Sequence, residues 1–380
     1  MSLPKELQAY LDDCYEEELQ LIRDMAVIPA PSHHEEKRAE FCKAWFEKNG
    51  FENVFIDEAL NVIAPYGVTD SNKLFVFSAH TDTVFPDTDP LPLKEDGENI
   101  YCPGIGDDTA NLVSMMIAAR YFVQKHRTPK CGILFVANSC EEGLGNLKGI
   151  RAIAAKYGDR MLGHISFDGA MKNRVVTSAV GSTRYEVTVR TEGGHSFQKF
   201  GNRNAIRYLA EVISAIYQIK VPELDGSRTS YNVGTVSGGT SVNTIAQEAK
   251  MLCEYRSNNR ECLEKMKTAF LGIFEAYRAM GIDLTYEVVG DRPCCGDVDP
   301  DAYAALIAMA DDGIRDLFGV EPVHGASSTD CNIPLSLGIP SICLTGAAGS
   351  GAHTRGEYIN KQGMKDGMKV AAFAIGTRFE

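Results

Sequence analysis

The sequence predicts an α/β fold in two domains, a largely parallel sheet with an inserted ferredoxin-like βαββαβ unit. Three observations predict it. The chain has 380 residues, 44% of them hydrophobic, which is enough for a large core and two domains. Towards both ends of the chain, short apolar runs alternate with amphipathic stretches, as strands and helices do in a parallel sheet. In the middle, the order of elements changes.

Four short apolar runs have the length and composition of buried strands. They are LFVFSA at 74–79, ILFVANS at 133–139, HISF at 164–167 and SICLT at 341–345. Helical periodicity predicts helices at 5–27, 35–49, 110–123 and 302–318. Ser32, followed three residues later by Glu35, predicts a capping box at the start of the second helix. These elements form the predicted first domain, residues 1–178 and 293–380.

Between about residues 181 and 290 the pattern becomes strand, helix, strand, strand, helix, strand. The segments are RYEVTVR, NAIRYLAEVISAIYQI, YNVGTVS, EAKMLCEYRS, ECLEKMKTAFLGIFEAYRAM and LTYEVV. Their order is that of a ferredoxin-like unit. We therefore predict a second domain at residues 179–292, inserted into the first, with hinges at 175–179 and 291–297.

Composition excludes several classes of protein. The net charge is -13 and no Lys/Arg cluster is visible, which argues against binding to nucleic acid or to an anionic membrane. The eleven cysteines are odd in number and include no Cys-x-x-Cys pair, so reduced thiols fit better than a disulfide framework or a zinc ribbon. No signal peptide and no apolar run of membrane-spanning length is visible. We expect a cytoplasmic protein.

Histidine and acidic residues follow the predicted strands, and in open α/β sheets ligands bind beyond the carboxyl ends of the strands. The candidates are His80 and Asp82, Asp107 and Asp108, Glu141 and Glu142, Asp168, and His353. Each has an ordinary alternative: Asp107 and Asp108 could cap a helix, the glutamates could be solvated, Asp168 could lie in a turn and His353 on the surface. Together, two histidines and three carboxylates suit a pair of zinc ions.

Chemical roles follow from the neighbours of these residues. His80 could bind a metal through one ring nitrogen while Asp82 holds the other. Of the adjacent glutamates, one could bind the metal and the other accept the proton of the attacking water. The carboxylates of Asp107, Asp168 and Glu142 with one hydroxide would balance the four positive charges of two zinc ions.

Seven segments, in order, resemble the signatures of the M20 family of exopeptidases and deacylases. They are SAHTDTV, GIGDDTAN, SCEEGLG, SFDG, GGHSF, SGGTSVN and GAHTRGEY. The resemblance spans nearly the whole chain. It implies a zinc exopeptidase catalytic domain with an inserted lid, which dimerises in many relatives, so a homodimer through residues 179–292 is expected.

The resemblance also implies roles for individual residues. Asp107 matches the carboxylate that bridges two zinc ions, for which Mn²⁺ or Co²⁺ could substitute. His80 and Asp168 match the ligands of one ion, and Glu142 and His353 those of the other. Glu141 matches the general base and Asp82 the residue that orients His80. In the family a cis peptide often follows the bridging aspartate, here between Asp107 and Asp108.

Three residues of the predicted lid match family substrate contacts, and Arg355, near the metals, is a further candidate for binding the substrate. His195 resembles the histidine that relatives send across a dimer to the substrate carbonyl oxygen, although it could be a turn residue. Asn243 and Arg256 resemble residues that contact a substrate carboxylate or backbone, although Arg256 could pair with a nearby acid. Arg355 and the segment Thr109-Ala110-Asn111 depart from the usual family pattern near the substrate pocket.

These observations lead to a functional hypothesis. The chain hydrolyses an amide bond in a small peptide, as a tripeptidase-like exopeptidase or aminopeptidase, through a metal-bridging hydroxide with Glu141 as general base. One alternative is an N-acyl-amino-acid deacylase of the same family. Others are a non-catalytic metal-bearing binding protein on the same fold and a structural protein with chance acidic turns.

Overall fold

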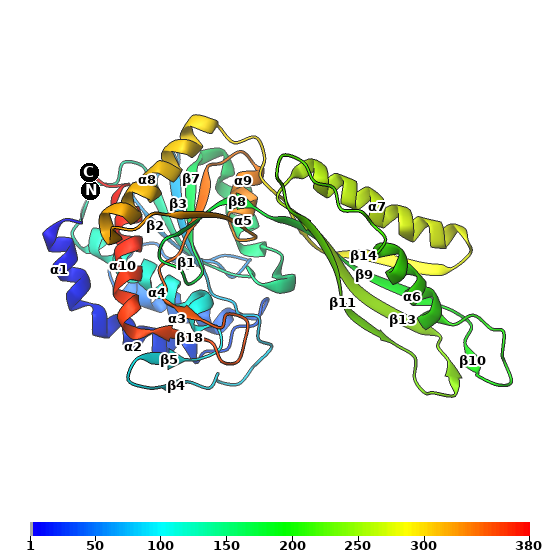
Figure 1. The fold of residues 1–380 in the computed structure, drawn as a ribbon. Coiled ribbons are helices and arrows are strands. Elements are labelled where there is room, and N and C mark those ends of the chain that lie inside the picture. The colour runs from blue at the N-terminus through cyan, green and yellow to red at the C-terminus, as the bar shows by residue number, and fades with distance from the viewer. Residues whose placement is uncertain (1–2) are drawn as a thin grey trace. The chain divides into compact units, whose positions relative to one another are not determined.

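The computed structural model describes residues 3–380, which form two compact units (Figure 1). The first unit runs to Ala179 and resumes with Gly296–Glu380, and the inserted unit is Val180–Cys295. None of the helices within residues 3–380 combines the length and the apolar character needed to cross a membrane.

The first unit is built on an eight-stranded sheet in the order β1-β2-β6-β3-β7-β16-β8-β15. The four predicted apolar strands are β6, β3, β7 and β16. They form the centre of this sheet and run parallel to one another. At one edge β1 and β2 pair antiparallel, and at the other β8 pairs antiparallel with β16 and parallel with β15. The strands are β1 (Phe55–Ile56), β2 (Val62–Tyr66), β3 (Leu74–His80), β6 (Gly132–Asn138), β7 (Met161–Phe167), β8 (Arg174–Ala179), β15 (Val323–Ser327) and β16 (Ser341–Leu344).

Side chains alternate between the two faces of this sheet, as the period of a strand requires. On β3, Phe75 and Phe77 join the larger core and Leu74 and Val76 the smaller one. The larger core includes α1 (Lys5–Asp13), α2 (Tyr15–Ala26), α3 (Glu36–Lys48), α4 (Ala110–Gln124), α8 (Pro300–Phe318) and α10 (Lys361–Gly376). The smaller core includes α5 (Lys148–Tyr157) and α9 (Asn332–Ser336). The sheet is therefore buried on both sides, which explains its apolar strands.

Short elements complete the first unit. A second sheet, in the order β17-β18-β5-β4, pairs residues 99–101 with 358–360 and so brings two distant loops together. Its strands are β4 (Lys94–Glu95), β5 (Asn99–Tyr101), β17 (Gly349–Ser350) and β18 (Tyr358–Asn360). The short helices are η1 (Ile105–Thr109), η2 (Gly143–Gly145) and η3 (Gly158–Arg160).

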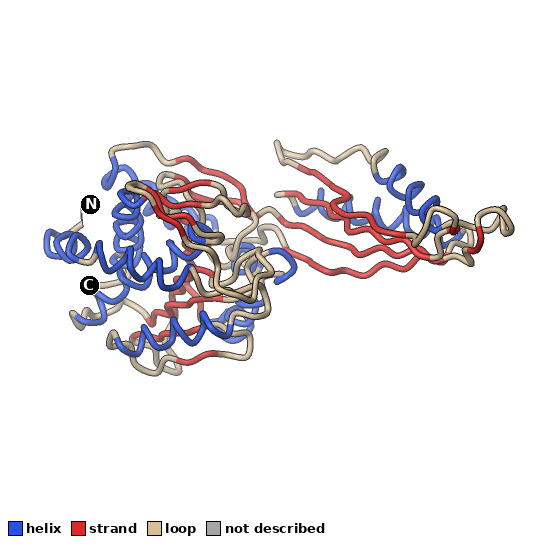
Figure 2. Tube along the Cα trace, turned by 90° about the horizontal axis from the view of Figure 1, so that it is seen from below, coloured by secondary structure: helices blue, strands red, loops and turns tan. Residues whose placement is uncertain are grey.

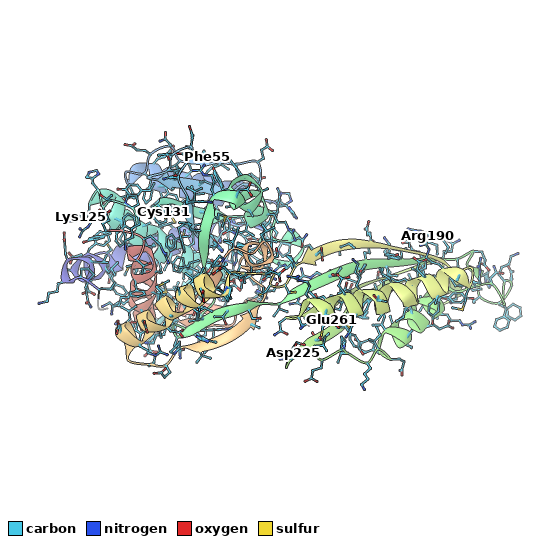
Figure 3. The ribbon with its side chains drawn as sticks, turned by 90° about the horizontal axis from the view of Figure 1, so that it is seen from above. Phe55, Lys125, Cys131, Arg190, Asp225 and Glu261 are labelled. Carbon is cyan, nitrogen blue, oxygen red and sulfur yellow. The ribbon has the colours of Figure 1, made fainter. Side chains whose placement is uncertain are left out.

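The inserted unit has the predicted βαββαβ order, with an antiparallel sheet in the order β11-β13-β9-β14. Its main elements are β9 (Gly181–Arg190), α6 (Ala205–Ile216), β11 (Thr229–Gly238), β13 (Glu248–Ser257), α7 (Arg260–Ala279) and β14 (Asp283–Arg292). Both helices cover one face of the sheet (Figure 2), over a core that contains Tyr185, Phe270 and Phe274. Charged side chains such as Arg190 and Glu261 are exposed on this unit (Figure 3). A two-stranded ribbon pairs β10 (Gly194–His195) with β12 (Thr244–Ile245).

Two local predictions are wrong. The capping box does not form: α3 begins at Glu36 without a side-chain cap, and the Ser32 hydroxyl instead donates to Asp82 Oδ2 at 2.6 Å. The two units divide after Ala179 and after Cys295, at the predicted hinge segments, although residues 175–179 themselves lie in β8 and pair with β15 and β16. The first predicted helix is divided into α1 and α2 at Cys14.

Candidate metal centre

The structure brings all five predicted ligands together. His80 is the last residue of β3, Asp168 follows β7, and Glu142 comes four residues after the end of β6. The ligand atoms of His80, Asp107 and Asp168 lie within 4.8 Å of one another, and so do those of Asp107, Glu142 and His353. Asp107 belongs to both groups, and these five residues are called the candidate metal centre below.

The two oxygens of Asp107 face different partners. Its Oδ1 lies 3.0 Å from His80 Nε2, and its Oδ2 lies 3.1 Å from His353 Nε2. His353 Nε2 is also 2.9 Å from Glu142 Oε1. A carboxylate placed in this way can bind two cations at once, one through each oxygen.

Asp82 supports three residues around the candidate metal centre. The Nδ1 of His80 lies 3.0 Å from the main-chain oxygen of Asp82 and 3.4 Å from Asp82 Oδ1. Because that oxygen can only accept, Nδ1 carries the proton and Nε2 is left to bind a cation. The Asp82 carboxylate also accepts the main-chain N–H groups of Glu141 and Glu142, each at 2.9 Å. Asp82 therefore positions the glutamates as well as His80.

The adjacent glutamates are buried, with exposed fractions of 5% for Glu141 and 6% for Glu142. The alternative that both are solvated surface residues is therefore wrong. A carboxylate oxygen of Glu141 lies within 4.8 Å of both a His80 nitrogen and a Glu142 oxygen. Glu141 is thus next to the candidate metal centre and close enough to exchange a proton with a water molecule held there.

The loop before Asp107 needs its glycine. Gly104 has φ +76°, and a Cβ there would lie 2.4 Å from Thr83 Cγ2. The peptide bond between Asp107 and Asp108 is cis, as the resemblance implied. Neither aspartate caps a helix with its side chain, so the capping alternative is wrong. Asp108 instead accepts the His80 main-chain N–H at 2.8 Å and an Asn111 N–H at 2.8 Å.

The sequence did not indicate a supporting role for two residues, although both lie inside quoted motifs and Asn111 was named as a departure from the family pattern. Glu357, in GAHTRGEY, accepts the main-chain N–H groups of Gly104, Gly106 and Asp107. The Asn111 side-chain oxygen, in GIGDDTAN, accepts the N–H groups of Gly346 and Ala347. Motif position was the only signal that could have indicated them, because their partners are far away in the sequence.

The titrating groups of the candidate metal centre share protons. Burial lowers the pKa of His80, but the carboxylates of Asp108, Asp107 and Asp82 outweigh it and hold that pKa well above its usual value. The hydrogen bonds that His353 donates to the carboxylates of Asp107 and Glu142 raise its pKa to about 10. Burial and the nearby Asp107 charge raise the pKa of Asp168 to about 7. The carboxylates therefore favour the protonated, positively charged form of both histidines. Bound metal cations could supply the positive charge in place of those protons.

Of the three proposed ligands His353, His80 and Glu142, His353 is the most open to solvent. The side chain of His353 is 56% exposed, whereas those of His80 and Glu142 are 1% and 7% exposed. Arg355, two residues further on, makes a bidentate ion pair with Asp87 at 2.8 and 2.7 Å and lies over the Phe85 ring. The predicted substrate contact Arg355 therefore already has an acidic partner.

Two of the predicted contacts in the inserted unit lie in one corner of it. His195 on β10 is opposite Thr244 on β12, and the Asn243 main-chain oxygen accepts the Ser196 N–H at 3.0 Å. His195 Nδ1 accepts the N–H groups of Phe197 and Gln198 at 3.3 and 3.4 Å, so His195 does contribute to its own turn. Its Nε2 is not used in these two bonds.

The third, Arg256, is held by an acid of its own strand. Its guanidinium donates to both oxygens of Glu254, at 2.7 and 3.1 Å. Glu254 also accepts from Arg184 at 3.1 Å. The alternative that Arg256 pairs with a nearby acid is therefore confirmed.

Comparison with known proteins shows the family to which the chain belongs. Residues 76–376 match Peptidase family M20/M25/M40. A succinyl-diaminopimelate desuccinylase from Acinetobacter baylyi is 25% identical over 80% of this chain and 81% of the relative. A tripeptidase from Staphylococcus aureus has the same fold, with a TM-score of 0.75 and 20% identity over 95% of this chain and 99% of that one. The YXEP protein of Bacillus subtilis, described as a dinuclear metal binding peptidase of the M20 family, has a TM-score of 0.65 and 16% identity over 97% and 99%. The chain therefore belongs to peptidase family M20/M25/M40, whose members are hydrolases that act on C–N amide bonds.

Proposed function

We propose that this chain is a dinuclear zinc exopeptidase that hydrolyses an amide bond in a small peptide, in the manner of a tripeptidase. The observation that carries the proposal is the placement of Asp107, whose two oxygens face two separate ligand groups with Glu141 beside them. The fold shared with a tripeptidase supports the choice of a small peptide.

The residues present fit two zinc ions. Zinc binds imidazole nitrogens and carboxylate oxygens, and His80, Asp107 and Asp168 would hold one ion while Asp107, Glu142 and His353 would hold the other. Mn²⁺ or Co²⁺ would suit the same donors. When bound, the ions would supply a water that is deprotonated near neutral pH and a Lewis acid for the scissile carbonyl.

The protein's own residues would do the remaining work. Glu141 takes the proton of the attacking water and passes it to the leaving amine. Asp82 keeps Glu141 in place through the main-chain bond at 2.9 Å. His195 of the partner subunit donates a hydrogen bond to the oxyanion of the tetrahedral intermediate. Asn243, Arg256 and Arg355 bind the substrate's carboxylate or backbone. Arg256 is paired with Glu254 and Arg355 with Asp87. Each arginine therefore either binds the substrate together with its acidic partner or releases that partner when the substrate binds.

The setting of the enzyme is also proposed. We place it in the cytoplasm as a homodimer that pairs through the inserted unit. All eleven cysteines are unpaired thiols, which fits a reducing compartment. Binding to nucleic acid or to a membrane is not part of the proposal.

The general base can be tested by comparing Glu141→Gln with Glu142→Gln. The first variant should retain both metal ions and lose turnover, because its amide cannot accept the proton. The second should bind less metal, because Glu142 is a proposed ligand. Metal analysis and peptide hydrolysis are measured on both, with the exposed Glu261→Gln on α7 as the matched control. Turnover that survives in Glu141→Gln would show that another group is the base.

A deacylase is the second candidate, because the relative from Acinetobacter baylyi is a desuccinylase. The chemistry at the metals would be the same, so only the substrate separates the two functions. A panel of tripeptides, dipeptides, and acetylated and succinylated amino acids distinguishes them. Cleavage of the tripeptides is expected, and cleavage of the acylated amino acids alone would replace the peptidase proposal with the deacylase.

A further inference from the structure

Glu357 is a buried carboxylate outside the proposed ligand set. It is 1% exposed and comes four residues after His353, next to β18. The pairing of β18 with β5 places this segment beside the loop that leads to Asp107. The Glu357 main-chain oxygen also accepts the Cys102 N–H at 3.2 Å, which continues that pairing. Glu357 therefore connects the segment that carries His353 to the loop that carries Asp107.

The Glu357 side chain receives three hydrogen bonds from one loop. Its Oε2 accepts the Gly104 N–H at 2.7 Å, and its Oε1 accepts those of Gly106 and Asp107 at 2.8 Å each. The three bonds fix the main chain up to and including Asp107, the residue shared by the two ligand groups.

We infer that Glu357 is a positioning residue, whose carboxylate holds the Asp107 main chain so that both Asp107 oxygens face their ligand groups. The inference rests on the proposed function, because it matters only if Asp107 binds metal. Metal sites depend on such support: groups that orient a ligand through hydrogen bonds commonly change metal affinity 10–100-fold when removed. Because His353 lies on the same segment, Glu357 also links the position of Asp107 to that of another proposed ligand.

A purely structural role is the competing explanation, since buried N–H groups need acceptors in any loop. The two roles differ in what they change. A structural acceptor would affect the melting temperature and leave metal affinity unchanged in the folded protein. A positioning residue changes the affinity for metal and the geometry around it, even where the protein remains folded.

Glu357→Gln is the direct test. The amide has the size of the carboxylate, but its NH₂ group would face an N–H donor. Zinc affinity is measured on the full chain by competition with a chromophoric chelator, and Co²⁺ geometry by the d–d absorption spectrum. We expect about 10–100-fold weaker zinc binding and an altered Co²⁺ spectrum. Glu18→Gln is the matched control, because Glu18 is equally buried but bonds to Ser114 instead, and it should bind both metals as the wild type does.

Gly106→Ala is a second variant that disturbs the same contact. A Cβ at Gly106 would lie 3.1 Å from Glu357 Oε1, so the carboxylate has to shift by a few tenths of an ångström. We expect weaker zinc binding again, by a smaller factor than in Glu357→Gln. This variant decides the question if Glu357→Gln does not fold.

The outcomes separate the inference from the function on which it rests. Wild-type zinc affinity and an unchanged Co²⁺ spectrum in the folded variant would overturn the positioning role alone. If the wild-type chain itself binds neither zinc nor Co²⁺, the proposed function fails, and the inference fails with it.

Discussion

The two units differ in where they place their acids. In the first unit eight carboxylic acids are buried: Glu18, Glu35, Asp82, Asp108, Glu141, Glu142, Asp330 and Glu357. In the inserted unit, whose residues all lie in the described part of the chain, no Asp or Glu is buried. Acids are rarely buried without partners, because desolvation disfavours their charge. The difference shows that the first unit, and not the inserted unit, bears the desolvation cost of burying carboxyl groups.

Most of those buried acids surround one point. Asp82, Asp108 and Glu357 accept hydrogen bonds from the main chain beside the candidate metal centre, Glu142 belongs to that centre, and Glu141 lies next to it. The inserted unit keeps its chemically distinctive residues on the surface, where His195 and Asn243 are exposed. All five residues of the candidate metal centre therefore belong to the first unit, whereas these two predicted substrate contacts lie on the surface of the inserted unit.

The substitution expected to have the largest effect on the first unit is Asp107→Asn. The amide removes the charge and one acceptor of the residue that both ligand groups share, so we expect both metal ions to be lost. Activity should fall by at least about 10²–10³-fold, the usual cost of removing a single electrostatic group at an active site. Metal analysis and peptide hydrolysis measure the two effects.

Asp225→Asn is the control for that substitution. Asp225 is an exposed turn residue of the inserted unit with φ +50°, a conformation that asparagine also adopts. It should retain both metal ions and full activity. Two bound metal ions in Asp107→Asn would mean that the shared-ligand assignment is wrong.

The centre of the fold could be predicted because its signals are local. β3, β6, β7 and β16 are apolar runs buried on both faces, and parallel strands end at the same edge of a sheet. The convergence of His80, Glu142 and Asp168 follows from that edge alone. The βαββαβ order of the inserted unit followed from periodicity in the same way.

Other features depend on long-range contacts, which a single sequence does not record. β2 contains Pro65 and β15 is partly exposed, so neither has the continuous apolar run of a central strand. Glu357 acts on Asp107 across 250 positions of sequence. Ser32 matched a helix-capping pattern, yet its hydroxyl bonds to Asp82, 50 residues away. Local pattern and tertiary contact competed there, and the contact with the buried carboxylate prevailed.

Glu18 allows a test of how the burial of a carboxyl group affects the stability of the first unit. It is fully buried between α2 and α4, bonds to Ser114 at 2.7 Å, and burial raises its pKa from 4.5 to about 8. The folded protein therefore keeps a proton that the unfolded chain releases above pH 4.5. Stability conferred by the neutral carboxyl is present below pH 4.5 and decreases as the pH rises towards 8.

Glu18→Gln removes this titration. We expect the variant and the wild type to differ little at pH 5, and the variant to gain about 4 kcal/mol relative to the wild type by pH 8. Trp45 is the single tryptophan of the chain and lies in the first unit, so its fluorescence during denaturation reports on that unit. A stability difference that is independent of pH between 5 and 8 would show that Glu18 is not held neutral.

The smallest expected effect concerns the inserted unit. His195 Nδ1 accepts two main-chain N–H groups, so the proton of the neutral imidazole is on Nε2, where it can be donated to an oxyanion. His195→Ala should lower kcat about 100-fold and leave the metal content unchanged. His126→Ala, an exposed histidine of the first unit, is the control and should retain the wild-type kcat. A loss of metal in His195→Ala would contradict the division of labour between the units.

Mixing two inactive variants shows which subunit supplies His195. Asp107→Asn lacks the shared ligand and His195→Ala lacks the donor, so neither homodimer has a complete site. If His195 acts across the dimer, each mixed dimer has one complete site, formed by the first unit of the His195→Ala chain and His195 of the other chain. Random exchange of subunits would then restore about a quarter of the wild-type activity, because half the dimers are mixed and each has one complete site of two. If His195 acts within its own chain, no mixture exceeds the residual activity of its components.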